Sequence, residues 1–93
     1  MSVKIRHETT RYVAYFDGDE VGELAYSRSG DLVTAWHTEV AEAAEGQGVG
    51  SALAQTFLDD TRAAGRRVVP RCPFVRGWID KHPDYADLVR SGP

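Results

Sequence analysis

Residues 44–53 read AEGQGVGSAL, with glycine at positions 46, 48 and 50. From Val49 onward, apolar residues recur at helical spacing, and Gly65 stands where a left-handed helix cap is favoured. The stretch therefore predicts a glycine-rich turn that opens a helix at Val49 or Gly50 and lets it run to Gly65.

The start of this predicted helix is a candidate anion site. The first N–H groups of a helix have no intrahelical partner, and the helix dipole is positive at that end. Without side chains at the three glycines, a pyrophosphate would reach several amides at once. The alternative is a strand-to-helix turn whose glycines only permit positive φ or close packing.

Extended segments precede the turn. Residues 11–17, 20–26 and 32–40 are rich in aromatic and β-branched residues, and turn signals at 18–19 and 29–31 separate them. A shorter strand at 3–7 is a further candidate, and Gly22 permits a β-bulge. These segments predict an antiparallel meander.

After the helix, residues 67–71 form a short predicted strand. Pro73 then opens a second helix that ends at His82, because Pro83 follows, and its apolar stripe consists of Phe74, Val75, Trp78 and Ile79. A final turn at 84–89 would return Tyr85 and Leu88 to the core. A helix links strands 32–40 and 67–71, so we expect these two strands to be parallel.

The fold class predicted by this order is α+β, with a mostly antiparallel sheet of four to five strands and two main helices in one domain, residues 1–93. The 93 residues include 42% hydrophobic residues and carry a net charge of -3. A net negative charge does not favour nonspecific binding to the phosphates of a nucleic acid. With no secretory leader or membrane-length apolar run, and with only one cysteine, we expect a cytoplasmic protein. The expected oligomeric state is a monomer or weak dimer.

Two familiar phosphate-binding motifs fit the glycine turn poorly. A P-loop needs a lysine after its last glycine, where this chain has Ser51, and a dinucleotide fingerprint needs G-x-G-x-x-G after a parallel strand. The turn instead resembles the acetyl-CoA signature of the GNAT superfamily of N-acetyltransferases, Q/R-x-x-G-x-G/A. Gly48 and Gly50 occupy its small-residue positions, and Glu45 departs from the usual Gln or Arg.

The resemblance extends over roughly residues 11–89. The segments HTEV (37–40), EGQGVGSAL (45–53), VVPRCPFV (68–75) and HPDYADLV (82–89) follow in order and look like the short single-domain branch of GNAT-like proteins. The resemblance implies acetyl-CoA, or CoA, as co-substrate. It implies cofactor-binding positions at Thr38, Val40, Gln47, Gly48, Val49, Gly50, Ser51, Cys72 and Pro73.

Cys72 is a candidate catalytic residue. It falls between the strand at 67–71 and the second helix, where the helix dipole favours a thiolate. A free cysteine is also a candidate small core residue, and position alone favours that interpretation. In the short GNAT-like branch the matching cysteine lies near the acetyl end of the cofactor, so the resemblance favours a role at the site.

The general acid of larger GNAT enzymes is missing here. Those enzymes place a tyrosine on the helix after this strand, and the comparable positions in this chain are Trp78 and Ile79, which have no phenol to donate a proton. The role would pass to Cys72, to a water molecule, or to Tyr85 if the last turn folds back.

His37 and Glu39 are the candidate catalytic bases. Glu39 and Glu42 precede the glycine turn, where a carboxylate can bind or deprotonate an amine directly or through water. His37 lies mid-strand and faces either the cleft or solvent. His82, at the end of its helix, suits a favourable interaction with the dipole. One cysteine and scattered histidines lack the spacing of metal ligands.

The leading hypothesis is an acetyl-CoA-dependent N-acetyltransferase. By the resemblance, a small amine, a protein lysine or a protein N-terminus would attack the thioester directly in a ternary complex, while a covalent acetyl-Cys72 intermediate is the variant. The alternative is a non-catalytic CoA-binding or protein-interaction module with the same fold. The missing tyrosine and the short chain motivate that alternative.

Overall fold

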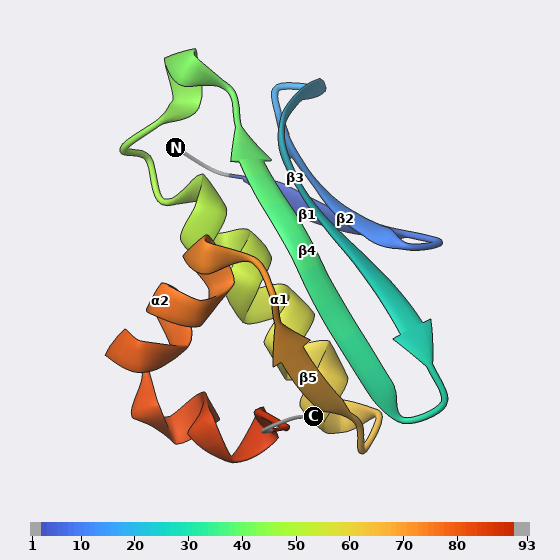
Figure 1. The fold of residues 1–93 in the computed structure, drawn as a ribbon. Coiled ribbons are helices and arrows are strands. Elements are labelled where there is room, and N and C mark those ends of the chain that lie inside the picture. The colour runs from blue at the N-terminus through green and yellow to red at the C-terminus, as the bar shows by residue number, and fades with distance from the viewer. Residues whose placement is uncertain (1–2, 91–93) are drawn as a thin grey trace.

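One five-stranded sheet carries two helices and two short 3₁₀ helices (Figure 1). The computed structural model describes residues 3–90. The elements are β1 (Lys4–Glu8), β2 (Arg11–Phe16), β3 (Asp19–Ser29), β4 (Leu32–Val40), η1 (Glu42–Ala44), α1 (Val49–Ala63), β5 (Arg67–Pro70), α2 (Pro73–Lys81) and η2 (Pro83–Leu88).

The strands lie in sequence order across the sheet. Pairs β1/β2, β2/β3 and β3/β4 are antiparallel, and β4/β5 is parallel. The predicted α+β class and the parallel last pair are therefore confirmed, and the strand expected at 3–7 is present at Lys4–Glu8.

The first predicted turn is displaced by one residue. Asp17 is not the end of a strand, because it has φ 51° and Gly18 has φ 82°. Positive φ at both central residues is the geometry of a two-residue hairpin turn, for which Asp-Gly is well suited. Strand β3 also runs three residues beyond the predicted end, to Ser29.

Two bulges interrupt the sheet. In β3, the pairing with β2 leaves Val21 without a partner beside Gly22, the residue at which the sequence permits a bulge. In β4, the pairing with β3 passes from Ala25↔His37 to Tyr26↔Ala35 and leaves Trp36 without a partner. A bulge bends its strand and increases the local twist. The bulge at Trp36, which the sequence did not reveal, divides β4 just beyond its contact with β5.

Helix α1 packs its apolar side on the sheet and closes with the predicted cap. Leu53, Phe57 and Leu58 are fully buried in the core. Gly65 has φ 70°, its N–H bonds to the Arg62 carbonyl, and the Arg66 N–H bonds to the Thr61 carbonyl. This pair of bonds is a Schellman motif, which satisfies carbonyls that the helix end leaves free.

Most of the apolar stripe predicted for helix α2 is buried. Pro73 is the first helical residue, and Val75, Trp78 and Ile79 are buried. The expectation for Phe74 was wrong, since its side chain is 44% exposed and lies outside the core. At the first turn of the helix, Phe74 faces the glycine turn rather than the sheet.

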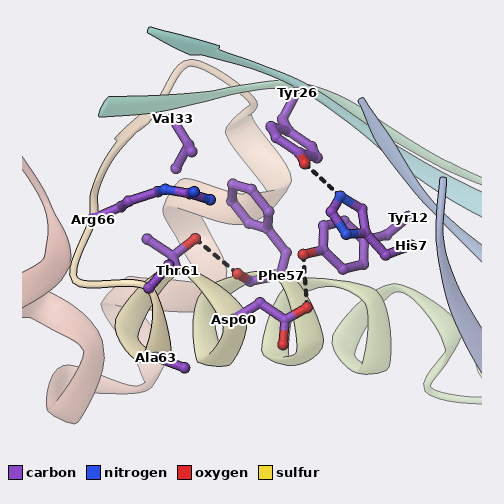
Figure 2. A pocket seen from close by; sticks show the side chains of 10 residues that line it. His7, Tyr12, Tyr26, Val33, Phe57, Asp60, Thr61, Ala63 and Arg66 are labelled. Atoms are coloured by element: carbon purple, nitrogen blue, oxygen red, sulfur yellow. Dashed lines mark hydrogen bonds between the residues drawn. The ribbon is translucent and has the colours of Figure 1, made fainter. Parts of the chain in front are cut away.

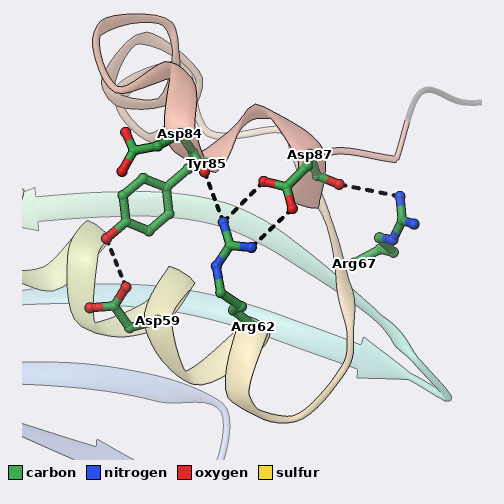
Figure 3. A network of polar contacts seen from close by, with 6 residues as sticks. All are labelled: Asp59, Arg62, Arg67, Asp84, Tyr85 and Asp87. Atoms are coloured by element: carbon green, nitrogen blue, oxygen red, sulfur yellow. Dashed lines mark hydrogen bonds and ion pairs between the residues drawn. The ribbon is translucent and has the colours of Figure 1, made fainter.

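The segment η2 is fastened to α1 by a polar network (Figure 3). Arg62 donates to both carboxylate oxygens of Asp87, at 2.9 and 3.0 Å, and to the Asp84 carbonyl at 2.8 Å. The Tyr85 hydroxyl donates to Asp59 at 2.7 Å. Leu88 is buried as predicted, and Tyr85 packs against the core. The C-terminal turn therefore folds back on α1.

Candidate active site

Strands β4 and β5 separate after four residue pairs. The pairing runs from Leu32↔Arg67 to Ala35↔Pro70, and a last bond joins the Cys72 N–H to the Ala35 carbonyl at 2.9 Å. Beyond it, residues 36–40 have no β5 partner within the part of the chain that the structure describes. Main-chain groups on this edge of β4 are therefore available to a ligand.

The turn beside this edge needs its glycines for two different reasons. Gly46 and Gly48 have φ 80° and 82°, and a Cβ on either would meet no atom within 4 Å. These two glycines are needed for their backbone conformation, which side chains disfavour. Gly50 lies within α1, where its lack of a side chain matters for packing.

Phe74 occupies the space that a side chain at position 50 would take. A Cβ on Gly50 would stand 2.7 Å from the Cζ atom of Phe74, closer than real Cβ contacts come. Gly50 therefore permits the aromatic ring to lie against the first turn of α1. The first turns of the two helices thus meet beside the end of β4.

Four consecutive main-chain donors remain free at this end of α1. The first bond of the helix runs from the Ala52 N–H to the Gly48 carbonyl at 3.0 Å, so the N–H groups of residues 48–51 have no main-chain acceptor in residues 3–90. The Gln47 N–H is used, since it bonds to the Ala44 carbonyl at 3.3 Å. The run of free donors therefore begins at Gly48 and does not include Gln47, and the helix dipole adds positive potential there.

These features enclose a cavity of about 460 Å³. Its lining residues are Thr38, Val40, Ala44, Glu45, Gly46, Gly48, Val49, Gly50, Ser51 and Phe74. The volume falls within the range of small-molecule sites. The cavity combines donor amides at one side with apolar walls at Val40 and Phe74, which suits a ligand with an anionic group and a less polar arm.

Most of the predicted cofactor positions come together here. Six of them line the cavity: Thr38, Val40, Gly48, Val49, Gly50 and Ser51. Gln47 and Pro73 lie beside the lining residues in sequence but are not among them. Sequence reasoning did not place Phe74 in this cavity, although an aromatic residue two positions after Cys72 was the available signal.

Cys72 does not line the cavity but contacts Thr38, which does. It is the N-cap residue of α2 and is 3% exposed. Its Sγ atom lies 3.5 Å from the Thr38 Oγ1 atom, so one of the two groups donates a weak hydrogen bond to the other. Because Thr38 lines the cavity and Cys72 contacts Thr38, the thiol is one residue removed from the cavity surface.

The candidate bases lie on the other face of β4. Side chains alternate along a strand, so His37 and Glu39 point away from the face on which Thr38 and Val40 line the cavity. Both are exposed. Glu39 borders a smaller hollow of about 200 Å³ together with Glu20 and Glu23. The cavity and the two bases are therefore on opposite sides of one strand.

The aromatic alternatives to a catalytic tyrosine are engaged elsewhere. The Trp78 indole N–H donates to the Ser51 hydroxyl at 2.8 Å, which ties α2 to the first turn of α1. The Tyr85 hydroxyl is bound to Asp59 on α1 and does not border the cavity. The His82 ring stacks on Trp78 at 3.8 Å, and its Nδ1 lies 2.7 Å from the Trp78 carbonyl.

Comparison with known proteins identifies the class. The profile of the GCN5-related N-acetyl-transferase family matches residues 11–88. The chain belongs to this family. A search of curated protein sequences found no match.

Solved structures share the fold. A GCN5-like protein from Staphylococcus aureus, solved by NMR, is 20% identical with a TM-score of 0.75, and the match covers 97% of this chain and 90% of that one. The ribosomal-protein-S18-alanine N-acetyltransferase from Escherichia coli is 18% identical with a TM-score of 0.62, covering 64% and 39%. A ribosomal-protein-alanine N-acetyltransferase from Brucella melitensis is 19% identical with a TM-score of 0.63, covering 89% and 62%. The chain thus spans well under half of the E. coli enzyme.

The described residues 3–90 contain neither a metal-ligand cluster nor a helix of membrane-spanning character. Within that range, no group of three or more His, Cys, Asp or Glu side chains is placed to hold a metal ion. No helix among the same residues is long and apolar enough to cross a membrane.

Proposed function

We propose that this protein is an acetyl-CoA-dependent N-acetyltransferase that transfers the acetyl group to an amine by direct attack in a ternary complex. The observation that carries the proposal is the meeting of four free amides at residues 48–51 with the unpaired edge of β4 in one cavity. Membership in the GCN5-related N-acetyltransferase family supports the same reaction class.

The diphosphate of the cofactor binds the amides of residues 48–51, where the helix dipole favours an anion. The pantetheine arm then runs along β4 past Thr38 and Val40, against the ring of Phe74. This path directs the thioester toward the gap that opens between β4 and Cys72. The chain's main contribution is to hold the thioester in attacking geometry.

The acceptor amine approaches from the face of β4 that carries His37 and Glu39. A cationic acceptor first loses one proton to the base, because only a neutral amine can attack. The neutral nitrogen then forms a bond to the thioester carbon, the carbon–sulfur bond breaks, and the second proton lost by the nitrogen is balanced by the proton gained by the CoA thiolate. Glu39, or His37, takes the amine's proton through water. A main-chain N–H near Val40 stabilises the developing oxyanion, and water protonates the leaving thiolate.

The acceptor is a cationic amine in this proposal. Glu39 stands opposite Glu23 in the register of β3 and β4, and Glu20 borders the same hollow. Arg11 lies 3.6 Å from the carboxylates of Glu20 and Glu23, whereas Glu39 has no ion pair among residues 3–90. Like charges facing each other across strands are unfavourable, so a cationic acceptor would relieve this repulsion.

The test is acetylation of a panel of small amines and lysine-containing peptides by the purified protein with acetyl-CoA, followed by mass spectrometry. We expect a product whose formation falls at least about 100-fold in the Glu39→Gln variant if Glu39 is the base. The matched Glu42→Gln variant, whose side chain borders neither hollow, serves as the control.

Two other results would redirect the assignment. Acetyl trapped on Cys72 after exposure to acetyl-CoA alone, at the rate of turnover, would replace direct attack by a covalent route. Thermal stabilisation by CoA without any product would overturn the enzymatic proposal in favour of a binding module.

A further inference from the structure

A second cavity, of about 370 Å³, opens at the opposite end of α1 (Figure 2). It lies where the last two turns of the helix face β1, β2 and β3, and it shares no lining residue with the cavity at the glycine turn. From Gly50 to Asp60 the helix rises about 15 Å. The second cavity is therefore separate from the proposed acetyl-transfer site.

Aromatic rings from three strands and the helix build the second cavity. His7 stacks on Tyr12 with ring centroids 4.4 Å apart. Tyr12 and Tyr26 pack against Phe57 at 5.8 and 5.3 Å. Rings packed in this way form a rigid wall with few rotatable bonds, which favours a preformed site.

Among these rings, Tyr12 bonds to Asp60, while His7 and Tyr26 bond to each other. The Tyr12 hydroxyl donates to Asp60 Oδ2 at 2.7 Å, and His7 Nε2 is hydrogen-bonded to the Tyr26 hydroxyl. Burial, and then the bond to Asp60, raise the pKa of Tyr12, so its hydroxyl remains a donor. The other carboxylate oxygen of Asp60 has no hydrogen-bond partner, and the carboxylate no ion pair, in the part of the chain described.

Arg66 supplies the opposite charge at the same cavity. It follows Gly65 in the capped turn, its side chain is half-buried, and Figure 2 shows its guanidinium reaching in beside Phe57, between Val33 and Thr61. Its guanidinium makes no hydrogen bond or ion pair within residues 3–90, whereas Arg62 is bound to Asp87. A guanidinium keeps its charge in any protein setting, so Arg66 presents a permanent cation.

We propose that this cavity binds a small zwitterion, an amino acid with a short apolar carbon chain. Its carboxylate pairs with Arg66, its ammonium pairs with the free oxygen of Asp60, and its carbon chain lies over Phe57. Asp60 and Arg66 line the same cavity and form no ion pair with each other among residues 3–90, so one molecule carrying both charges would satisfy both. This proposal does not rest on the acetyl-transfer function.

The test is a titration of the ¹⁵N-labelled full chain, followed by NMR, with L-leucine, 4-aminobutyrate and 6-aminohexanoate, which differ in the separation of their charges. 4-Methylpentanoate, which is leucine without its ammonium, and isopentylamine, which is leucine without its carboxylate, are the matched compounds. We expect saturable shifts at residues 57–66 with at least one zwitterion and at least about tenfold weaker binding of the single-charge compounds.

Variants locate the site. Arg66→Gln and Asp60→Asn should each weaken binding by about tenfold or more. Asp60→Asn still accepts the Tyr12 hydrogen bond, so it leaves the wall intact. Arg62→Gln removes the same charge one turn away, outside the cavity, and should leave the dissociation constant unchanged. Absence of saturable shifts with all three zwitterions, or equal binding by Arg66→Gln, would overturn the proposal.

Discussion

The ring of Phe74 rests on the first turn of α1 at Gly50, so closely that a Cβ there would stand 2.7 Å from its Cζ atom. Both residues line the cavity at the glycine turn. This contact gives the third glycine of the sequence motif a purpose different from that of Gly46 and Gly48. The shape of the cavity therefore depends on the absence of a Cβ at position 50.

Gly50→Ala should therefore weaken CoA binding more than it changes stability. The methyl group pushes the exposed Phe74 ring out of its place, while alanine favours the helix by up to about 1 kcal/mol over glycine. We expect a dissociation constant for CoA, measured by calorimetry, that rises by up to about tenfold. If the ring transmits the effect, Gly50→Ala in a Phe74→Ala background will add little, and full additivity would contradict this.

Glu45→Gln should tighten CoA binding. The Glu45 carboxylate borders the same cavity as the amides of residues 48–51, so it repels an incoming diphosphate. Two unit charges 4 Å apart in water interact by about 1 kcal/mol, which corresponds to an increase of about fivefold in affinity. Glu42→Gln, the same change outside the cavity, is the control. Equal affinities for Glu45→Gln and the unaltered protein would show that the diphosphate binds elsewhere.

Gly22→Ala should destabilise the fold. A Cβ on Gly22 would meet Val49 Cγ1 at 3.0 Å, the Glu39 carbonyl oxygen at 3.1 Å and Leu53 Cδ1 at 3.3 Å. Overpacking of this kind costs about 1–3 kcal/mol, measurable by urea unfolding. Gly77→Ala is the matched control, because a Cβ there meets nothing within 4 Å and alanine stabilises α2 by up to about 1 kcal/mol. A neutral Gly22→Ala would show that α1 can move away from the sheet.

The Arg62–Asp87 pair should add an acid-sensitive contribution to stability. The hydrogen bonds from Arg62 hold the pKa of Asp87 below its usual value of 3.8. A lowered pKa in the folded state gives stability that is present above pH 3.8 and lost as the pH falls through the lower, folded value. The difference in melting temperature between the unaltered protein and Asp87→Asn should thus be small, because the pair is exposed. This difference should be constant near neutral pH and should become smaller in acid. A difference that grows in acid would contradict the assignment.

The sequence predicted the elements and the glycine turn because both depend on local signals. Apolar periodicity placed α1 at Val49, and Pro73 and Gly65 marked helix ends, as the structure confirms. The bulge at Trp36 and the exposure of Phe74 depend on which strands and helices meet, and no local pattern specifies that.

The same limit applies to the two cavities. Thr38, Gly48 and Ser51 were expected at one site through a family resemblance, and they line one cavity. The cavity between Tyr12, Asp60 and Arg66 joins residues far apart in sequence, so no spacing could have indicated it.

The most direct test of the account is an NMR titration of the ¹⁵N-labelled protein with CoA. We predict saturable shifts of the amides of residues 48–51, with smaller shifts at residues 38–40 along the free edge of β4. Residues 57–66, at the other end of α1, should stay unmoved. If saturating CoA leaves the NMR signals of the amides of residues 48–51 unshifted, the result would contradict the central claim that these donors bind the diphosphate.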